Sequence, residues 1–291
     1  MKQHYVPQFL LKSWAKNNDD NKLEVFTIDL KNIVSSRLTP EYTGYEDDLF
    51  AFDHESVRGI DKQFNETRLF KYIDNHGARV LQKIKFKGLK LLTDKDKNDW
   101  ALFIMSLFNR QPKFINQLKI DGTKIIQLKL NENPEEYDEI SSVNDPDKLE
   151  QFVEKEYPGL IENFGLYTLK DLINNSKIGT KILNFKWFYL EFKNTPIEII
   201  LSDNPCILIN GIDDENCVLA LPISPNSVFF ATKSLQNKKR ILKSNNRNLI
   251  KRLNQSSINQ AKNRVYATTK VPSYNFIKNH LIKSKSMGKN K

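Results

Sequence analysis

Four polar side chains lie at positions where a rigid element could direct them into a cleft. His4 opens the stretch HYVPQF, and Arg110 lies in the stretch NRQP. Asp203 and Asn204 follow the apolar run IEIILS, and the end of a strand can aim a side chain from a firm base. His4 could move a proton because histidine titrates near neutral pH. Arg110 could hold a phosphate. Asp203 could orient either His4 or Arg110, or it could bind a metal.

Each of these residues also has a structural interpretation. The His4 ring could cap a neighbouring carbonyl with Tyr5 packed beside it, since Pro7 fits the start of a helix without any chemistry. Asp203 could close an Asx turn by accepting hydrogen bonds from the backbone just after it. A buried ion pair between Arg110 and Asp203 is compatible with both interpretations.

A helix must position Arg110. Thr93 and Asp94 are candidate caps for this helix. Its apolar stripe consists of Trp100, Phe103, Leu107, Phe114 and Leu118. Arg110 falls on the same stripe, so its guanidinium should face the core and need a carboxylate or phosphate partner. Pro112 removes one helical hydrogen bond, which predicts a bend in the axis.

Positive charge is concentrated in the carboxyl-terminal third. The net charge is +10, and sixteen Lys and Arg residues but no Asp or Glu follow Glu215. Such a region attracts polyanions, of which nucleic acid is the commonest inside cells. The predicted nucleic-acid-binding residues are Arg247, Lys251, Arg252, Lys262 and Arg264. Alternatively, this region docks on the acidic segment 132–162, which carries eleven acids and two lysines.

Other kinds of site lack their usual signatures. Cys206 and Cys217 form no CxxC pair, so we expect a reduced, buried pair and no thiolate zinc site. The chain has no GxxxxGK(S/T) phosphate loop, no GxGxxG and no GxSxG. An acidic turn could coordinate a divalent cation, although a solvated turn is the simpler interpretation; its residues are Glu46, Asp47, Asp48, Asp53 and Glu55. The metal is therefore undetermined, with Mg²⁺ as a candidate.

The order of the predicted elements indicates an α+β fold. Residues 23–29 alternate like a half-buried strand, and helical patterns occupy about 61–180. Short apolar runs separated by turn residues then predict an antiparallel meander at about 185–270, which includes a helix before its last strand. Residues 1–278 are expected to form a single domain in which the helices pack with this sheet. Residues 279–291 are expected to form a basic flexible tail.

With these elements placed, the chain resembles a bacterial family, the domain of unknown function numbered 4238. The resemblance covers about residues 3–270 and rests on HYVPQFLLKSWA, NRQP, LSDNP with LPISP, and NQAKNRVYATT. Family members usually have Thr where Gln111 stands here, and their second-helix glutamate matches either Glu66 or Asp74. The family has no settled activity. The resemblance implies cargo of mobile elements and, for some members, defence against bacteriophage.

These features favour a cytoplasmic defence effector that acts on nucleic acid, most concretely a hydrolase of phosphodiester bonds. A non-catalytic sensor of nucleic acid or a phage component is the alternative, and a protein that docks a partner from the same operon is a third hypothesis. No apolar run approaches the ~18 residues that span a bilayer, and the amino terminus lacks a secretory signal pattern. We therefore expect no membrane contact.

Overall fold

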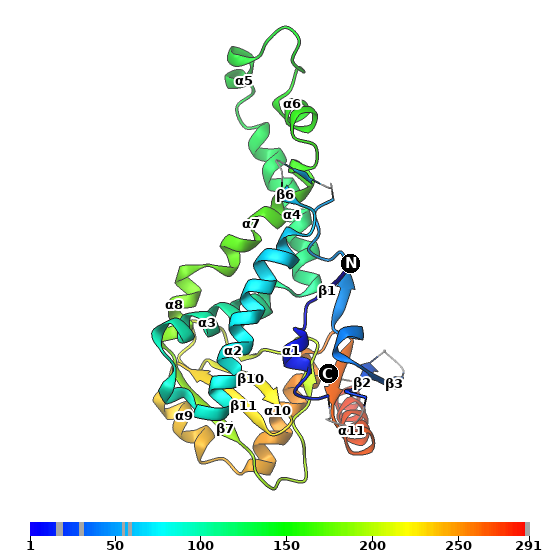
Figure 1. Cartoon of the computed structure of the whole chain (residues 1–291), viewed down its shortest axis with the longest axis vertical. Coiled ribbons are helices and arrows are strands. Elements are labelled where there is room, and N and C mark those ends of the chain that lie inside the picture. The colour runs from blue at the N-terminus through cyan, green and yellow to red at the C-terminus, as the bar shows by residue number, and fades with distance from the viewer. Residues whose placement is uncertain (16–19, 29–31, 54–55, 58–59, 289–291) are drawn as a thin grey trace.

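The structure is a computed structural model that describes residues 1–15, 20–28, 32–53, 56–57 and 60–288. Side chains are described over the same ranges except 56–57 and 282–288. The fold is α+β, as the sequence predicts, with antiparallel sheets and a helical middle of the chain (Figure 1). No described helix is long and apolar enough to cross a lipid bilayer.

One four-stranded sheet is built from the carboxyl-terminal half of the chain. Its order is β7–β11–β10–β9, with all neighbours antiparallel. The strands are β7 (Lys186–Glu191), β9 (Ile207–Ile209), β10 (Val218–Ser224) and β11 (Ser227–Thr232). Every residue of β10 and β11 is buried, as expected for central strands covered on both faces. Cys206 and Cys217 are both buried and free, as the sequence predicts.

A second four-stranded sheet joins the two ends of the chain in the order β3–β2–β12–β8. Its strands are β2 (Leu23–Ile28), β3 (Ile33–Leu38), β8 (Leu201–Ser202) and β12 (Arg264–Ala267). The predicted single meander at 185–270 is therefore wrong in connectivity, because β8 pairs with β12 instead of β9. Period-2 alternation identifies strands but does not select their partners.

A short two-stranded sheet holds the amino terminus. Strand β1 (Lys2–His4) pairs antiparallel with β4 (Tyr45–Asp47), so that His4 lies opposite Tyr45. The two rings approach at 5.5 Å between centroids. Helix α1 (Gln8–Leu11) follows directly, after Pro7. β1 therefore fixes where His4 and the residue after it can point.

Helices fill the middle of the chain and flank its last strands. The π-helix η2 (Asn65–Phe70) leads directly into α2 (Lys71–Lys87). The following helices are α3 (Asp94–Asn109), α4 (Pro112–Leu130), α5 (Pro134–Ile140), α6 (Leu149–Glu156), α7 (Leu160–Ile173) and α8 (Ser176–Asn184). The carboxyl-terminal helices are α9 (Leu235–Leu242), α10 (Asn246–Gln260) and α11 (Lys270–Gly288). Helix α11 includes part of the segment expected to be a flexible tail, whose mobility stays a prediction.

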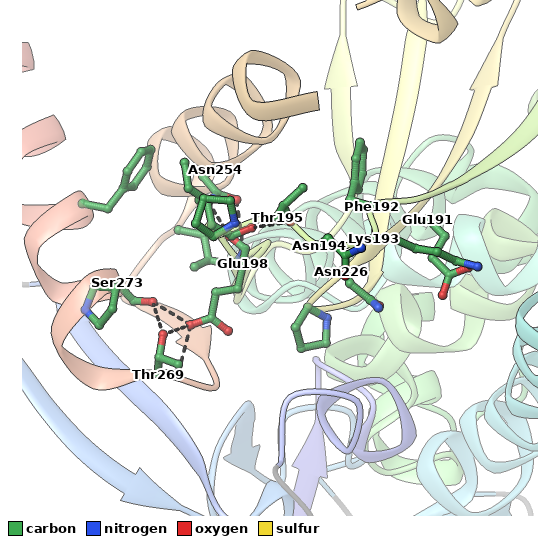
Figure 2. A pocket seen from close by; sticks show the side chains of 16 residues that line it. Glu191, Phe192, Lys193, Asn194, Thr195, Glu198, Asn226, Asn254, Thr269 and Ser273 are labelled. Atoms are coloured by element: carbon green, nitrogen blue, oxygen red, sulfur yellow. Dashed lines mark hydrogen bonds and ion pairs between the residues drawn. The ribbon is translucent and has the colours of Figure 1, made fainter. Parts of the chain in front are cut away.

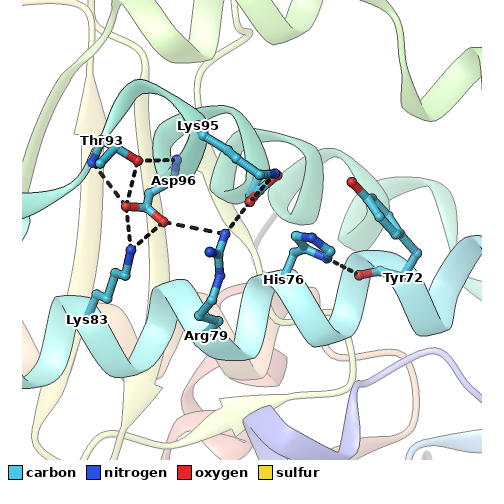
Figure 3. Close-up of polar contacts among 8 residues, drawn as sticks. Tyr72, His76, Arg79, Lys83, Thr93, Lys95 and Asp96 are labelled. Carbon is cyan, nitrogen blue, oxygen red and sulfur yellow. Dashed lines mark hydrogen bonds and ion pairs between the residues drawn. The ribbon is translucent and has the colours of Figure 1, made fainter.

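A polar network fixes the start of α3 against α2 (Figure 3). Thr93 is the N-cap, as predicted, and forms a capping box with Asp96. Lys83 of α2 donates to both oxygens of Asp96 at 2.8 and 2.7 Å, and Arg79 donates to Asp99 at 2.7 Å. Burial alone would raise the Asp96 pKa, but the hydrogen bonds from Lys83 and Thr93 lower it to about 2. The register between α2 and α3 is thus set by charge as well as by apolar packing.

Helices α4 and α7 approach closely through two glycines. A Cβ added at Gly165 would overlap the Leu118 carbonyl, and one at Gly122 would overlap Gly165. These two helices extend away from the sheets to a tip that carries α5 and α6 (Figure 1). The acidic segment 132–162 forms this tip.

Candidate functional site

His4 lines a cavity of 350 Å³. The residue is 7% exposed, and its Nδ1 lies 3.5 Å from the side-chain nitrogen of Gln8. Nε2 is buried and makes no well-aligned hydrogen bond with a described residue, although the backbone at Glu41 and Pro40 is close enough to interact with the ring. Burial lowers the His4 pKa, while the backbone at Glu41 and Pro40 and the Asp74 carboxylate act in the opposite direction. The ring is therefore mainly neutral at neutral pH and can accept a proton.

Arg110 lies between α3 and α4 and is fully buried. Its Nη1 donates to Asp74 Oδ2 at 3.1 Å, and Nη2 donates to Asp74 Oδ1 at 2.8 Å. Nη2 also donates to the Ser106 hydroxyl at 2.7 Å, and the guanidinium stacks over the Phe70 ring. The predicted core-facing orientation and carboxylate partner are confirmed. Pro112 ends one helix and begins another instead of bending a single axis, since it cannot donate a helical hydrogen bond.

Two of the roles predicted for Arg110 need correction. Its ion pair is with Asp74, not with Asp203. The guanidinium has no exposed surface and already binds a carboxylate and a hydroxyl, so it cannot hold a substrate phosphate directly. Asp74 is one quarter exposed and lines the same cavity as His4. Arg110 is therefore a positioning residue that fixes one wall of this cavity from the core side.

Glu66 brings a second carboxyl group to the cavity. It lies in the π-helix η2, and widened π turns often occur at functional sites. Its Oε2 is buried and has no hydrogen-bond partner among the described residues. Burial raises the Glu66 pKa, the Arg110 charge lowers it and Asp74 raises it, with a value of about 7 as the result. Both candidates for the family glutamate, Glu66 and Asp74, thus reach one cavity, and Glu66 is the one without an ion-pair partner there.

The cavity combines proton-transfer groups with positive charge. Lys12 follows α1 and Lys71 begins α2; both side chains are exposed and line the cavity. Neither makes an ion pair with a described carboxylate. A neutral histidine and a carboxyl group with a pKa near neutrality form a base and an acid that can act at the same pH. Two free ammonium groups would favour an anionic substrate. We call this space the His4–Glu66 cavity.

Asp203 lies outside the His4–Glu66 cavity, and its carboxylate is held by hydrogen bonds from backbone amides. It is 2% exposed, and its carboxylate accepts from the amides of Lys262 at 2.8 Å, Asn263 at 2.7 Å and Arg264 at 2.9 Å. The donors come from the turn between α10 and β12 and not from the residues just after Asp203, so the predicted Asx turn has the wrong partners. Burial raises the Asp203 pKa, and these three amides act against that rise. Asn204 offers its backbone carbonyl to the Ser202 hydroxyl at 2.6 Å.

The four predicted catalytic residues therefore do not form one constellation. His4 and Arg110 are linked through Asp74 at the His4–Glu66 cavity, whereas Asp203 lines a different cavity together with Tyr5. Consecutive residues of an extended segment point to opposite sides, so His4 and Tyr5 face the two different cavities.

The predicted nucleic-acid-binding residues are spread along the last third of the chain. The side chains of Arg247, Arg252 and Lys262 are exposed, and those of Lys251 and Arg264 are half-buried. No ion pair links any of these residues to a described carboxylate. The acidic tip lies at the other end of the molecule from α9 and α10 (Figure 1). The alternative in which the basic third docks on the acidic segment is therefore not what the structure shows.

A third cavity, of 720 Å³, lies beside Glu198 (Figure 2). The Glu198 carboxylate accepts from the amides of Thr268 and Thr269, both at 2.9 Å, and from the Ser273 hydroxyl at 2.8 Å. The hydroxyls of Thr268 and Thr269 also donate to it. A carboxylate with every oxygen bonded anchors the start of α11 and is not free to move a proton.

Comparison with known proteins shows the family to which the chain belongs. A family model described as protein of unknown function (DUF4238) matches residues 2–271. The chain belongs to the DUF4238 family. No curated protein and no solved structure matches it.

For this DUF4238 chain, the described residues contain no group of three or more His, Cys, Asp or Glu side chains placed to hold a metal ion. In the acidic turn, Asp48 instead accepts from the amino terminus at 3.0 Å and from Gln63 at 2.9 Å. Glu55 of the same predicted set lies outside the described residues. The metal and Mg²⁺ stay undetermined.

Sequence reasoning missed the role of Glu66. Its position before an amphipathic helix gives no chemical signal, since exposed glutamates are common at helix starts. Only the family pattern drew attention to it, and that pattern left Asp74 as an equal choice. The long-range pairing of Arg110 with Asp74 separates the two acids by environment, because it leaves Glu66 as the carboxyl group without an ion pair to a described residue.

Proposed function

We propose that this protein is a cytoplasmic defence effector that hydrolyses phosphodiester bonds in nucleic acid. The single observation that supports hydrolysis is the His4–Glu66 cavity. Its lining includes His4 and Glu66, whose pKa is raised to about 7, beside two lysines that make no ion pair with a described carboxylate. Support for the defence role comes from the family resemblance.

In the proposed reaction a water molecule attacks phosphorus and loses its proton to the neutral His4 ring. The bond from phosphorus to the leaving oxygen breaks, and Glu66 gives its proton to that oxygen. Lys12 and Lys71 would offset the negative charge of the phosphate as the water attacks. Asp74, held by Arg110, favours the charged ring that forms when His4 accepts the proton.

The test is incubation of the pure protein with labelled RNA and DNA, with and without Mg²⁺ or Mn²⁺. We expect the wild type to cut one of them. His4→Ala and Glu66→Gln should each lower the rate by about 100-fold or more, the usual effect of removing a general acid or base. Circular dichroism would establish that both variants fold. The proposal fails if no substrate is cut, or if both folded variants cut at the wild-type rate.

A second candidate is a non-catalytic nucleic-acid-binding protein. It is favoured by the exposed cations of α9, α10 and the turn between them, which have no carboxylate partners in the described part of the chain. These cations are Lys239, Arg240, Lys243, Arg247 and Arg252. Such a surface binds phosphates in a salt-dependent manner and needs neither His4 nor Glu66.

Alanine replacement on two surfaces tests this candidate. Changing Arg247, Lys251 and Arg252 together should weaken binding and lower the slope of log affinity against log salt by roughly 1 for each phosphate that the variant no longer binds. The matched control replaces Lys148, Lys155 and Lys170, which are exposed lysines of the acidic tip and α7. Equal affinities for the two triple variants would contradict binding through α10. Binding without cutting would select this candidate over the hydrolase.

A further inference from the structure

A second cavity, of 420 Å³, lies on the other side of the amino-terminal strand. Five stretches that are far apart in the sequence line it, one of which is Asp203. Tyr5 follows β1, and Glu46 belongs to β4. Gln111 precedes α4, whose first turns contribute Lys113 and Asn116, and the turn between α10 and β12 contributes Lys262 and Asn263. The Asp203 carboxylate holds that last turn in place by accepting three hydrogen bonds from its backbone amides.

Tyr5 presents an unused hydrogen-bond donor to this cavity. The residue is 5% exposed, and its hydroxyl makes no hydrogen bond with any described residue. Burial, together with the Asp203 charge, raises the Tyr5 pKa to about 12. The phenol therefore keeps its proton over the whole physiological range. A donor that faces a cavity and has no protein partner is available to a ligand.

Two cations without carboxylate partners flank the same space. Lys113 and Lys262 are exposed and line the cavity, and neither makes an ion pair with a described residue. Two carboxyl groups also line the cavity, but Asp203 is 2% exposed and accepts three backbone amides, and Glu46 makes no ion pair with a described lysine. Lysine side chains bind phosphate as mobile point charges. The cavity is thus suited to an anionic group at its rim.

Amide side chains supply part of the polar wall. The side chains of Asn116 and Asn263 make no hydrogen bonds with described residues, and Gln111 uses only its nitrogen, on the Leu107 carbonyl at 3.1 Å. Free amides can donate and accept at once, which is how proteins read the edges of nucleobases. Pro112 and Ile120 add apolar surface on which a planar base could rest.

We infer that this cavity binds one unpaired nucleotide of the nucleic-acid substrate. Lys113 and Lys262 contact its phosphate, while Tyr5 and the amides contact its base. The inference rests on the proposed function, since it supplies the pocket for a nucleotide that flanks the bond being cut. Cavities of about 300–1,000 Å³ are typical of small-molecule sites, so the volume fits a mononucleotide.

The experiment is titration calorimetry of the full-length protein with the four ribonucleoside 5′-monophosphates and, separately, with inorganic phosphate. We expect at least one nucleotide to bind more tightly than phosphate does. The variant with Lys113→Ala and Lys262→Ala should bind about tenfold or more weakly. Tyr5→Phe, which removes only the hydroxyl, should weaken nucleotide binding but leave phosphate binding unchanged. The control with Lys148→Ala and Lys170→Ala should bind like the wild type.

Two outcomes would overturn the inference: no nucleotide binds, or phosphate and all four nucleotides bind alike and the two double-lysine variants are equivalent. Binding does not require catalysis, so this result is independent of the cleavage assay. A protein that binds nucleotides here but cuts nothing would refute the hydrolase and keep the pocket. A protein that cuts nucleic acid but binds no mononucleotide would support the hydrolase and refute the nucleotide pocket.

Discussion

Arg110 and Asp74 form a two-pronged ion pair between a fully buried guanidinium and a carboxylate that lines a cavity. The pair connects the junction of α3 and α4 to α2, across 36 residues of sequence. It leaves Glu66 as the uncompensated carboxyl group of that cavity. The proposed chemistry depends on this division of roles between the two acids.

Removing one partner of this ion pair should destabilise the fold strongly. Arg110→Met would leave Asp74 without its cation and expose the Ser106 hydroxyl to an apolar neighbour, so we expect the free energy of unfolding in urea to fall by about 3–5 kcal/mol. The double variant with Asp74→Leu should be destabilised less than Arg110→Met alone, because no unpaired charge remains. Equal or additive effects would contradict the pairing.

Glu66 should make stability depend on pH in a defined direction. Its pKa is raised from 4.5 to about 7 in the folded state, so folding favours the protonated form. The associated stability is present below about pH 4.5 and is lost as the pH rises through about 7. The glutamine of Glu66→Gln stays neutral at every pH. The free energy of unfolding of this variant minus that of the wild type should therefore increase by on the order of 2–3 kcal/mol from acid to alkaline pH.

Urea unfolding of both proteins at about pH 5 and about pH 8 measures this difference. Titration of other groups is common to both proteins and cancels in the comparison. A stability difference that stays constant between the two pH values would show that Glu66 has an ordinary carboxyl pKa.

Asp203 is predicted to be a structural anchor. Asp203→Asn keeps the size of the side chain but replaces one acceptor oxygen by an amide that cannot accept from the backbone. We expect a destabilisation of about 1–3 kcal/mol per donor left unsatisfied. Hydrogen exchange at the amides of Lys262, Asn263 and Arg264 should become faster than in the wild type. Unchanged exchange at these amides would refute the assignment.

The close approach of α4 and α7 offers a matched pair of glycine variants. Gly165→Ala should cost about 1–3 kcal/mol, because the added Cβ would overlap the Leu118 carbonyl. Gly179→Ala in α8 meets no atom within 4 Å and should instead stabilise by about 0.5–1 kcal/mol through helix propensity. Thermal unfolding of the two variants would measure both effects. A Gly165→Ala protein as stable as the wild type would contradict the close packing of the two helices.

Local patterns in the sequence predict most of the elements but not their long-range partners. The capping residue Thr93, the buried orientation of Arg110 and the strand positions in 185–270 follow from periodicity and turn chemistry. The partners of these elements do not, because strand register and ion pairing join residues that are distant in sequence. The placement of β12 between β2 and β8 is one example, and the Arg110–Asp74 pair is another.

The sequence predicts only part of the candidate site for the same reason. His4 is identifiable by its residue type and by the stretch around it. Its separation from Asp203 follows from the alternation of His4 and Tyr5 across an extended segment. This separation could not be predicted from the sequence, because the two cavities form only in the packed structure. The pKa of Glu66 depends on burial, and burial is a property of the packed structure.

The rate of nucleic-acid cleavage as a function of pH, measured for the wild type and for Glu66→Gln, tests the central claim most directly. With Glu66 as the acid, the wild-type rate should fall above about pH 7 as its proton is lost, and Glu66→Gln should be slower by about 100-fold and lack this fall. A wild-type rate that stays constant from about pH 6 to about pH 9, or a Glu66→Gln profile identical to wild type, would contradict it.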